Sequence, residues 1–288
     1  EKGILKSDIL CCPNLNDDNI DSWQPSFRRF ASEHSYTIVK LDNLYEIANL
    51  VFISLEFDRI VKPELFATKS LYNIHFSLLP AYKGMFTSIM PIINGENKSG
   101  VTLHYIDSGI DTGRIIDQIE FPIGIMERGF DLYQSYLKHS KDLLERNLNN
   151  IIGKLITSKV QKCLGASYYS NKSVDFSNIK VDYRKTAFEI HNWIRAFTFR
   201  PYQLVEIQNS FISHTELTEV RSTKKPGHVT KIDNLSYILS TIDYDLIIYL
   251  DLLEEILEAS KNDNVDLIRR AAELKYTLED KNSKGWNS

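Results

Sequence analysis

The sequence predicts an α/β protein with a doubly wound, mostly parallel, Rossmann-like sheet, followed by a small β-rich, OB-like domain and a helical tail. In the first half, short apolar runs alternate with helical patterns, which is typical of βαβ units. After about residue 166 the segments alternate apolar and polar residues between brief turns, which is typical of a small antiparallel sheet or barrel. We therefore expect a first domain over residues 1–165, a second over 166–250 and a helical segment over 251–288.

Short apolar runs bounded by polar residues, Gly or Pro predict buried strands in the first half, at residues 9–11, 37–41, 50–55, 72–76 and 101–106. Helical periodicity predicts helices over 23–34 and 61–68, the second with Pro63 near its start, where a missing amide donor costs nothing. A strand over 114–121 completes a hairpin with the fifth run. An amphipathic helix over about 129–155 follows.

The second half of the sequence differs in composition and in its apolar pattern. Residues 168–180 are rich in Ser, Asn and Tyr and are typical of a linker, and residues 187–196 predict a short helix. Alternating patterns then predict strands over 202–207, 227–233, 236–241 and 245–251. The stretch 252–278 is helical again, and the sequence LIRRAAELKYTLEDKNSKGWNS resembles the end of one ankyrin repeat and the start of another.

Composition excludes several classes of function. The 34 basic and 38 acidic side chains give a net charge of -4, which disfavours bulk binding to nucleic acid. Cys11, Cys12 and Cys163 are an odd number without a CxxC pair, so we expect neither a disulfide framework nor a metal site, and a reducing, cytoplasmic setting. No apolar run reaches the length of about 18 residues that a membrane span needs, so we expect a soluble protein.

The residues between 73 and 113 carry the chemistry. Asn73 and His75 are two apart on a predicted strand, so both side chains point to the same face, near the strand's carboxyl end, where ligands bind in open α/β sheets. Asp111 lies between Gly109 and Gly113, a pattern typical of a backbone that approaches a ligand closely. A neutral amide donor, an imidazole that accepts a proton near neutral pH and an acid that orients it suit acyl transfer to an amine.

The segments NIHFSLLPAYKG, INGEN and GVTLHYIDSGIDTG resemble the signature of the 10-formyltetrahydrofolate-dependent formyltransferases, which include methionyl-tRNA formyltransferase, glycinamide ribonucleotide transformylase and the sugar N-formyltransferases. The resemblance implies that Asn73, His75 and Asp111 are catalytic. Phe76 is a departure, since many relatives have Pro there. The resemblance also implies 10-formyltetrahydrofolate as co-substrate, with no metal, bound near these residues: Phe57, Asp58, Arg59, Ile60, Asp107, Gly109 and Ile110.

The segments KGMFTSIMPIING and IRAFTFRPYQ resemble the sugar-modifying branch. This resemblance implies a thymidine-diphosphate (dTDP)-linked amino-dideoxy sugar as acceptor, with the ankyrin-like tail favouring a 3-amino-3,6-dideoxyhexose, for lipopolysaccharide O-antigen synthesis, in a homodimer that binds neither nucleic acid nor membrane. The residues implied to contact this acceptor are Tyr82, Lys83, Met85, Phe86, Phe199, Arg200 and Tyr202. The family's first βα unit has no counterpart before residue 9, so we expect it to lie outside this chain.

Other interpretations stay open at this point. A methionyl-tRNA formyltransferase would need a basic groove, and a nicotinamide-dependent enzyme would need a GxGxxG turn that these residues lack. A catalytically dead relative is disfavoured by the intact Asn73, His75 and Asp111. Lys83 fits a solvated surface nearly as well as a phosphate site, and we interpret His104 as structural because it is out of register with the apolar positions of its strand. The sequence does not decide between a 3-amino and a 4-amino sugar.

Overall fold

The structure, a computed structural model, describes residues 4–21, 24–199 and 203–251. The chain divides into two compact units. Unit 1 comprises Glu1–Pro91, Glu96–Gly124 and Leu132–Val174, and unit 2 comprises Ile92–Gly95, Ile125–Asp131 and Asp175–Ser288. The sequence placed the domain change at residues 165/166, whereas these units change over at Val174.

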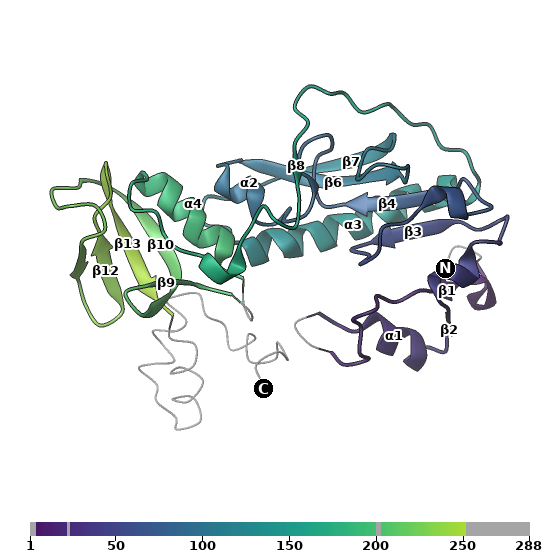
Figure 1. Cartoon of the computed structure of the whole chain (residues 1–288), viewed down its shortest axis with the longest axis horizontal. Coiled ribbons are helices and arrows are strands. Elements are labelled where there is room, and N and C mark those ends of the chain that lie inside the picture. Colours follow the sequence, from purple (N-terminus) through teal and green to yellow (C-terminus); the bar gives the residue numbers. More distant parts are fainter. Residues whose placement is uncertain (1–3, 22–23, 200–202, 252–288) are drawn as a thin grey trace. The chain divides into compact units, whose positions relative to one another are not determined.

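Within the described part of unit 1 lies a four-stranded sheet with the order β3-β4-β6-β7 (Figure 1). Its strands are β3 (Phe52–Leu55), β4 (Leu71–His75), β6 (Lys98–Tyr105) and β7 (Ile115–Pro122). The β3–β4 pair is parallel, but the β4–β6 and β6–β7 pairs are antiparallel. The prediction of a mostly parallel sheet is therefore wrong for this sheet. The antiparallel β6–β7 pair is the hairpin that the sequence predicts, because its connection is shorter than the dozen or more residues that a parallel crossover needs. The difference lies in β6, which runs antiparallel to β4.

Shorter elements complete unit 1. A separate parallel pair is formed by β1 (Leu10–Cys11) and β2 (Thr37–Ile38), and β5 (Lys83–Gly84) pairs in parallel with β8 (Tyr168–Tyr169). Helix α1 (Phe27–Glu33) begins after Ser26, whose side chain accepts a hydrogen bond from the Arg29 amide and so caps the helix. Other short helical segments among the described residues are η1 (Lys6–Asp8), η2 (Leu41–Leu44), α2 (Met90–Ile93) and, in unit 2, η4 (Phe176–Asn178).

The helix expected over residues 61–68 is wrong, because only the 3-10 turn η3 (Pro63–Leu65) forms there. Val61 and Phe66 instead fill a core cluster around Phe52 and Leu71, so their spacing reflects core contacts of a loop and not one face of a helix. By contrast, the long amphipathic helix is confirmed as α3 (Gly129–Ile152). Its Tyr136 is fully buried and stacks on Phe76, with ring centroids 4.9 Å apart.

Unit 2 contains an antiparallel sheet with the order β11-β12-β13-β10-β9. Its strands are β9 (Val205–Ile207), β10 (Ser210–Arg221), β11 (Val229–Lys231), β12 (Ser236–Leu239) and β13 (Tyr244–Leu250), and helix α4 (Ala187–Phe197) contacts β10. Strand β10 was not predicted, because its charged residues interrupt the alternation of apolar and polar residues. Ile212 and Thr215 are buried there, and the His191 ring on α4 contacts the Thr215 hydroxyl at 2.6 Å. The predicted ankyrin-like tail lies outside the described residues.

Among the residues that the structure describes, no helix combines the length and the apolar character needed to cross a bilayer. The 24-residue α3 contains many charged side chains and fits this finding.

Candidate active site

Three neighbouring strands of the unit 1 sheet present polar side chains in one row. In the register of the sheet, Ser54 on β3 faces Asn73 on β4, and Asn73 faces His104 on β6. Because directly opposite residues project to the same face, the three side chains meet. The Ser54 hydroxyl donates to Asn73 Oδ1 at 2.7 Å, and Asn73 Nδ2 lies 3.2 Å from His104 Nε2. This row fixes the Asn73 amide from both sides.

His104 determines which way the Asn73 amide points. Its Nδ1 lies 2.8 Å from the carbonyl oxygen of Tyr105, which can only accept, so Nδ1 carries the proton. When Nε2 carries no proton, its lone pair accepts from Asn73 Nδ2. The second N–H of Asn73 faces Asp111 Oδ1 at a long 3.4 Å, which leaves it weakly engaged. His104, which the sequence pattern indicated to be structural, thus lies in contact with Asn73 and Asp111.

His75 lies two residues after Asn73 on the same face of β4 and is only 8% exposed. Its Nε2 lies 2.7 Å from the backbone carbonyl of Tyr82, so this nitrogen must be the donor. Nδ1 faces Asp111 Oδ2 at 3.5 Å. Burial lowers the pKa of His75 below its usual value, and this outweighs the opposing effect of Asp111. The ring is therefore neutral at neutral pH, with its lone pair directed towards a carboxylate.

Asp111 reaches this face from the connection between β6 and β7, in a left-handed backbone conformation with φ of 52°. Its Oδ2 accepts a hydrogen bond from the Gly84 amide at 2.8 Å. Burial alone would raise the pKa of Asp111, but the contacts with His104, His75 and Gly84 together lower it to about 2. The carboxylate is thus ionised at neutral pH, and it stabilises a proton that arrives on His75.

A second row of polar side chains on the sheet anchors the loop that follows β4 and carries Tyr82. His75, Thr102 and Gln118 are direct neighbours across β4, β6 and β7. The Thr102 hydroxyl accepts from Gln118 Nε2 at 2.9 Å and from the Leu79 amide at 3.1 Å, and it donates to the Ser77 carbonyl at 2.6 Å. All hydrogen-bonding capacity of this buried hydroxyl is used. The loop after β4 is therefore anchored to the middle of the sheet.

The site lies on the face of the sheet. His75 is the last residue of β4 and therefore lies at the carboxyl end of the strand, where the site was expected. Because β6 runs antiparallel to β4, the Asp111 loop starts near the amino end of β4 and folds back across it. The result is a neutral base, an ionised carboxylate and an oriented amide donor in one cluster. Such a group can take a proton from an attacking nucleophile and stabilise negative charge on a carbonyl oxygen.

The residues expected to bind folate occupy two loops. Arg59 donates to the Pro13 carbonyl at 2.6 Å, and its guanidinium lies 4.2 Å from the centre of the Phe57 ring. Asp107 accepts from the Gly109 amide and the Thr112 hydroxyl, which shapes the second loop. Phe57 of the first loop and Ile106 beside the second pack on the same core cluster. Asp58, Ile60 and Ile110 are exposed at the surface. The binding role of these seven residues stays a prediction.

The residues expected to bind the acceptor are divided between the units. In unit 1, the Tyr82 ring stacks on Tyr169 at 5.7 Å and its hydroxyl donates to Glu96 at 2.7 Å. Lys83, Met85 and Phe86 follow on the same loop, and Met85 is 49% exposed. In unit 2, Phe199 is 2% exposed and packs against Phe130, so its position gives no support to a substrate role. Arg200 and Tyr202 lie outside the described residues.

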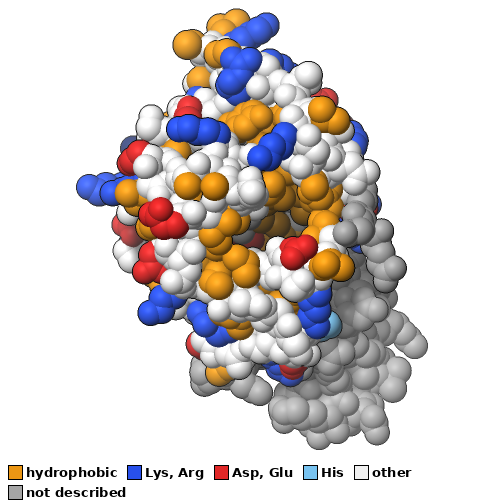
Figure 2. Space-filling view, turned by 90° about the vertical axis from the view of Figure 1, so that its right-hand side faces the viewer, with side chains coloured by type: hydrophobic (Ala, Val, Ile, Leu, Met, Phe, Trp, Pro, Cys, Tyr) orange, Lys and Arg blue, Asp and Glu red, His pale blue; other side chains and the backbone are white. Residues whose placement is uncertain are grey.

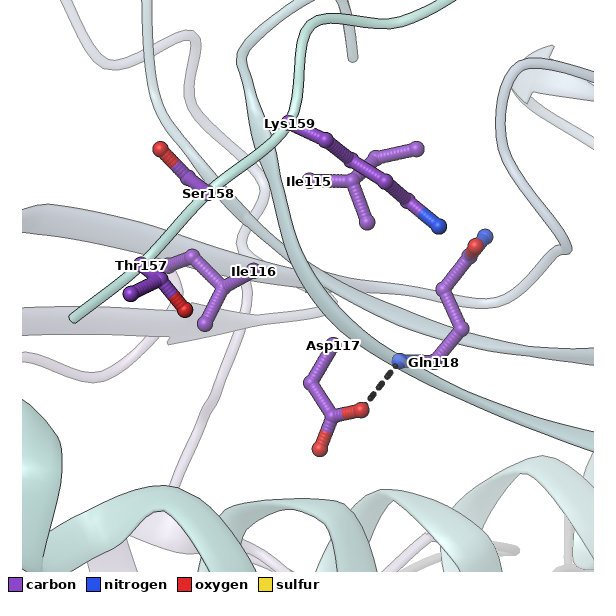
Figure 3. A pocket seen from close by; sticks show the side chains of 7 residues that line it. All are labelled: Ile115, Ile116, Asp117, Gln118, Thr157, Ser158 and Lys159. Carbon is purple, nitrogen blue, oxygen red and sulfur yellow. Dashed lines mark hydrogen bonds between the residues drawn. The ribbon is translucent and has the colours of Figure 1, made fainter.

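A groove on unit 1 lies between β7 and the segment after α3 (Figure 3). Its walls are residues 115–118 and residues 157–159, and the Asp117 carboxylate accepts from the Gln118 amide at 2.9 Å. This groove contains none of Asn73, His75, His104 and Asp111, which form the polar cluster on the sheet, so we assign no ligand to it.

Comparison with known sequences shows similarity to formyl transferases. A family profile described as formyl transferase matches residues 26–148. The methionyl-tRNA formyltransferase of Alkaliphilus oremlandii (strain OhILAs) is 32% identical over 176 residues, which cover 59% of this chain and 54% of that protein. That of Clostridioides difficile (strain 630) is 29% identical over 212 residues, 72% of this chain and 68% of that protein. The chain thus spans about half the length of the first of these relatives.

Two solved structures are more similar in sequence to this chain than these methionyl-tRNA formyltransferases are. WlaRD, described as a sugar 3N-formyl transferase in the presence of dTDP and 5-N-formyl-THF, is 44% identical with a TM-score of 0.81, covering 86% of this chain and 90% of that chain. An N-formyltransferase from Helicobacter canadensis in complex with folinic acid and dTDP-3-aminofucose is 40% identical with a TM-score of 0.81, covering 86% of this chain and 91% of that chain.

Proposed function

The chain belongs to the formyl transferase family, and we propose that it transfers a formyl group from 10-formyltetrahydrofolate to the amino group of a dTDP-linked 3-amino-dideoxy sugar. The observation that carries the proposal is the cluster of Asn73, His75, His104 and Asp111 on one face of the sheet. It supplies a base and an oxyanion donor without a side-chain nucleophile, which is what direct transfer of a formyl group between two nitrogens requires.

The co-substrate supplies the formyl carbon. The sugar amine attacks this carbon, a new N–C bond forms, and the bond between the formyl carbon and N10 breaks. During the attack negative charge develops on the formyl oxygen, and the N–H of Asn73 that makes only the long contact with Asp111 is available to donate to it. His75 takes the proton that the amine loses at Nδ1, where the ionised Asp111 stabilises the imidazolium. The departing N10 nitrogen takes this proton from the His75 imidazolium, which leaves His75 neutral again and balances the step.

The loops fit a folate. A pterin presents a flat aromatic ring with a hydrogen-bonding edge, and it is matched by apolar side chains next to exposed backbone groups. Ile60 and Ile110 are 76% and 43% exposed on the two loops expected to hold it. The solved structures of WlaRD and of the Helicobacter canadensis N-formyltransferase were determined with 5-N-formyl-THF or folinic acid, which supports the same ligand here.

Two observations favour a sugar over tRNA as acceptor. The sugar-modifying relatives are 40% and 44% identical, against 32% and 29% for the tRNA-modifying relatives. On the face shown in Figure 2, Lys and Arg side chains are scattered among apolar and acidic ones, and its described residues form no continuous basic surface. A tRNA acceptor would need such a surface to neutralise its phosphates.

The 3-amino position is supported by the two sugar-modifying relatives, one described as a 3N-formyl transferase and the other bound to dTDP-3-aminofucose. By analogy we keep Tyr82, Lys83, Met85 and Phe86 as candidate contacts to the sugar nucleotide. A homodimer, a cytoplasmic location and a role in lipopolysaccharide O-antigen synthesis rest on the sequence alone and stay predictions.

The test is formylation of a panel of dTDP-linked 3-amino and 4-amino sugars with 10-formyltetrahydrofolate, followed by mass spectrometry. His75→Asn and Asp111→Asn serve as catalytic controls. We expect turnover of a 3-amino sugar that both substitutions abolish. Preferred turnover of a 4-amino sugar would overturn the 3-amino assignment, and formylation of methionyl-tRNA alone would overturn the sugar assignment while leaving family membership intact.

A further inference from the structure

The segment that follows α3, residues 157–169, returns over the sheet of unit 1 to β8, and we call it the strap (Figure 1). At its start it lies along β7 (Figure 3), where Ile115 and Lys159 exchange two backbone hydrogen bonds of 2.8 Å. The Arg114 guanidinium also donates to the Ser158 carbonyl at 2.7 Å. At its end β8 pairs with β5. The strap is therefore attached at both ends, and the residues between are held over the loops that carry the catalytic groups.

Gln161 is the strap residue that contacts the Asp111 loop. Its Nε2 donates to the carbonyl oxygens of Asp111 and Gly113, at 2.7 Å and 2.8 Å. Both acceptors are carbonyls, so only the nitrogen end of the amide can face them. The other end, Oε1, is buried and has no hydrogen-bond partner among the described residues. The amide oxygen of Gln161 is thus unpaired, which costs free energy, while the amide nitrogen donates two hydrogen bonds to the Asp111 loop.

This loop needs an external support. Asp111 has a left-handed backbone, which is uncommon for residues other than glycine. At Gly113 a Cβ would collide with the carbonyl oxygen of Tyr105, so the chain passes close to the end of β6. Neither residue lies in a strand, and the carbonyls that a strand would have paired are the two that Gln161 binds.

The strap also supports the opposite side of His75. The Ser167 hydroxyl accepts from the Tyr82 amide at 2.7 Å, and the Ser167 carbonyl accepts from the Lys83 amide at 2.9 Å. The carbonyl of the same Tyr82 accepts from His75 Nε2. The strap therefore forms hydrogen bonds with two loops, the Asp111 loop facing Nδ1 of His75 and the Tyr82 loop facing Nε2.

We infer that Gln161 is a positioning residue that holds the backbone of Asp111, so that its carboxylate stays directed at His75 Nδ1 while it is also bound by the Gly84 amide. Gln161 touches no reacting atom and acts only through the Asp111 loop. The inference rests on the proposed formyl transfer for its catalytic consequence, but its structural content concerns the free protein. Asp111, His104 and the Tyr82 carbonyl are the groups that face His75 and set its protonation.

The test compares Gln161→Met, which keeps the length but removes both donors, with Gln161→Glu, which keeps the shape but turns an oxygen towards the two carbonyls. Lys162→Met, at the adjacent exposed position, is the matched control. His75 is titrated by NMR in each free protein, and kcat and KM are measured with the best sugar of the panel. We expect kcat to fall about 10-fold to 100-fold in both Gln161 variants, with KM changed less than about twofold.

We also expect the His75 midpoint to move to lower pH in both variants, because a displaced Asp111 no longer favours the charged ring. Lys162→Met should match the wild type. A wild-type midpoint in Gln161→Met and Gln161→Glu would overturn the inference, even with reduced kcat, because a general loss of folded protein lowers kcat without moving that midpoint. If Gln161→Met fails to fold, Gln161→Glu alone decides. If the wild type formylates no sugar, the proposed function fails, and the NMR titration still tests Gln161.

Discussion

Replacing His104 with phenylalanine should lower kcat for formyl transfer while leaving the three catalytic side chains present. The substitution keeps an aromatic ring at a position that is 2% exposed, so the core stays filled. It removes Nε2, the acceptor that orients the Asn73 amide, and Nδ1, the donor to the Tyr105 carbonyl. The Asn73 amide then keeps only Ser54 and the long contact to Asp111 as partners.

The magnitude follows from the lost hydrogen bond. A buried N–H without a partner costs about 1–3 kcal/mol, and the amide avoids this cost by turning towards Asp111, away from the direction in which the formyl oxygen arrives. If the transition state bears that cost in full, the rate falls about 5-fold to 150-fold. Complete loss of an oxyanion donor typically costs about 100-fold to 1000-fold, which sets the upper limit for His104→Phe and the expectation for Asn73→Ala.

The assay is steady-state formylation of the sugar nucleotide at saturating 10-formyltetrahydrofolate, at a temperature well below the Tm of each variant. His34→Phe on the exposed end of α1 is the matched control for a His-to-Phe change. A kcat for His104→Phe within twofold of the wild type would refute the reasoning, because Asn73 would then keep its orientation without His104. Equal losses in His104→Phe and His34→Phe would refute it as well.

Three further predictions follow from the same site. The kcat of the wild type should fall at acid pH with a midpoint below 6.5, because the base must be neutral and burial lowers the pKa of His75 from that value; a pH–rate profile with a midpoint above 6.5 would contradict this. Asp111 has a pKa of about 2 in the folded protein against 3.8 in the unfolded chain, so it contributes about 2 kcal/mol of stability above pH 3.8 that is lost as the pH falls towards 2. In urea unfolding, the free energy of unfolding should therefore fall less between pH 4 and pH 2 for Asp111→Asn than for the wild type. Equal decreases in the two proteins would count against the lowered pKa of Asp111. Gly113→Ala should destabilise unit 1 by about 1–3 kcal/mol, because its Cβ would collide with the Tyr105 carbonyl. Gly165→Ala is the comparison for backbone strain without a collision, because Gly165 has a φ of 77° and no atom within 4 Å of its added Cβ. An unchanged Tm for Gly113→Ala would exclude the collision.

Local patterns predicted many of the elements. The strands at residues 9–11, 50–55 and 72–76 and the helices at 129–155 and 187–196 all form within a few residues of the expected bounds. These segments have clear apolar periodicity, and burial follows that periodicity directly. The two clear failures have a shared cause. The helix expected over 61–68 and the unnoticed β10 depend on what the rest of the chain packs against them, and no local pattern contains that information.

The residues of the proposed site were predicted to different degrees. Asn73 and His75 share a face because of their spacing alone, so the sequence placed them together. The position of His104 beside Asn73 could not be predicted from the sequence, because it depends on the register between β4 and β6. Gln161 gave no signal at all, since its partners are two backbone carbonyls about 50 positions away in the chain.

The sequence by itself therefore determined the family, the amide, imidazole and carboxylate of the site, and the helix that covers one part of the sheet. Only the tertiary structure decided that the sheet is mixed, that the site lies on its face, and that His104 and the strap orient Asn73 and Asp111. The physical reason is the range of the interactions. Side-chain direction within one strand is a local property, whereas strand register, a carbonyl acceptor and the pKa of a buried group depend on segments that meet only when the chain folds.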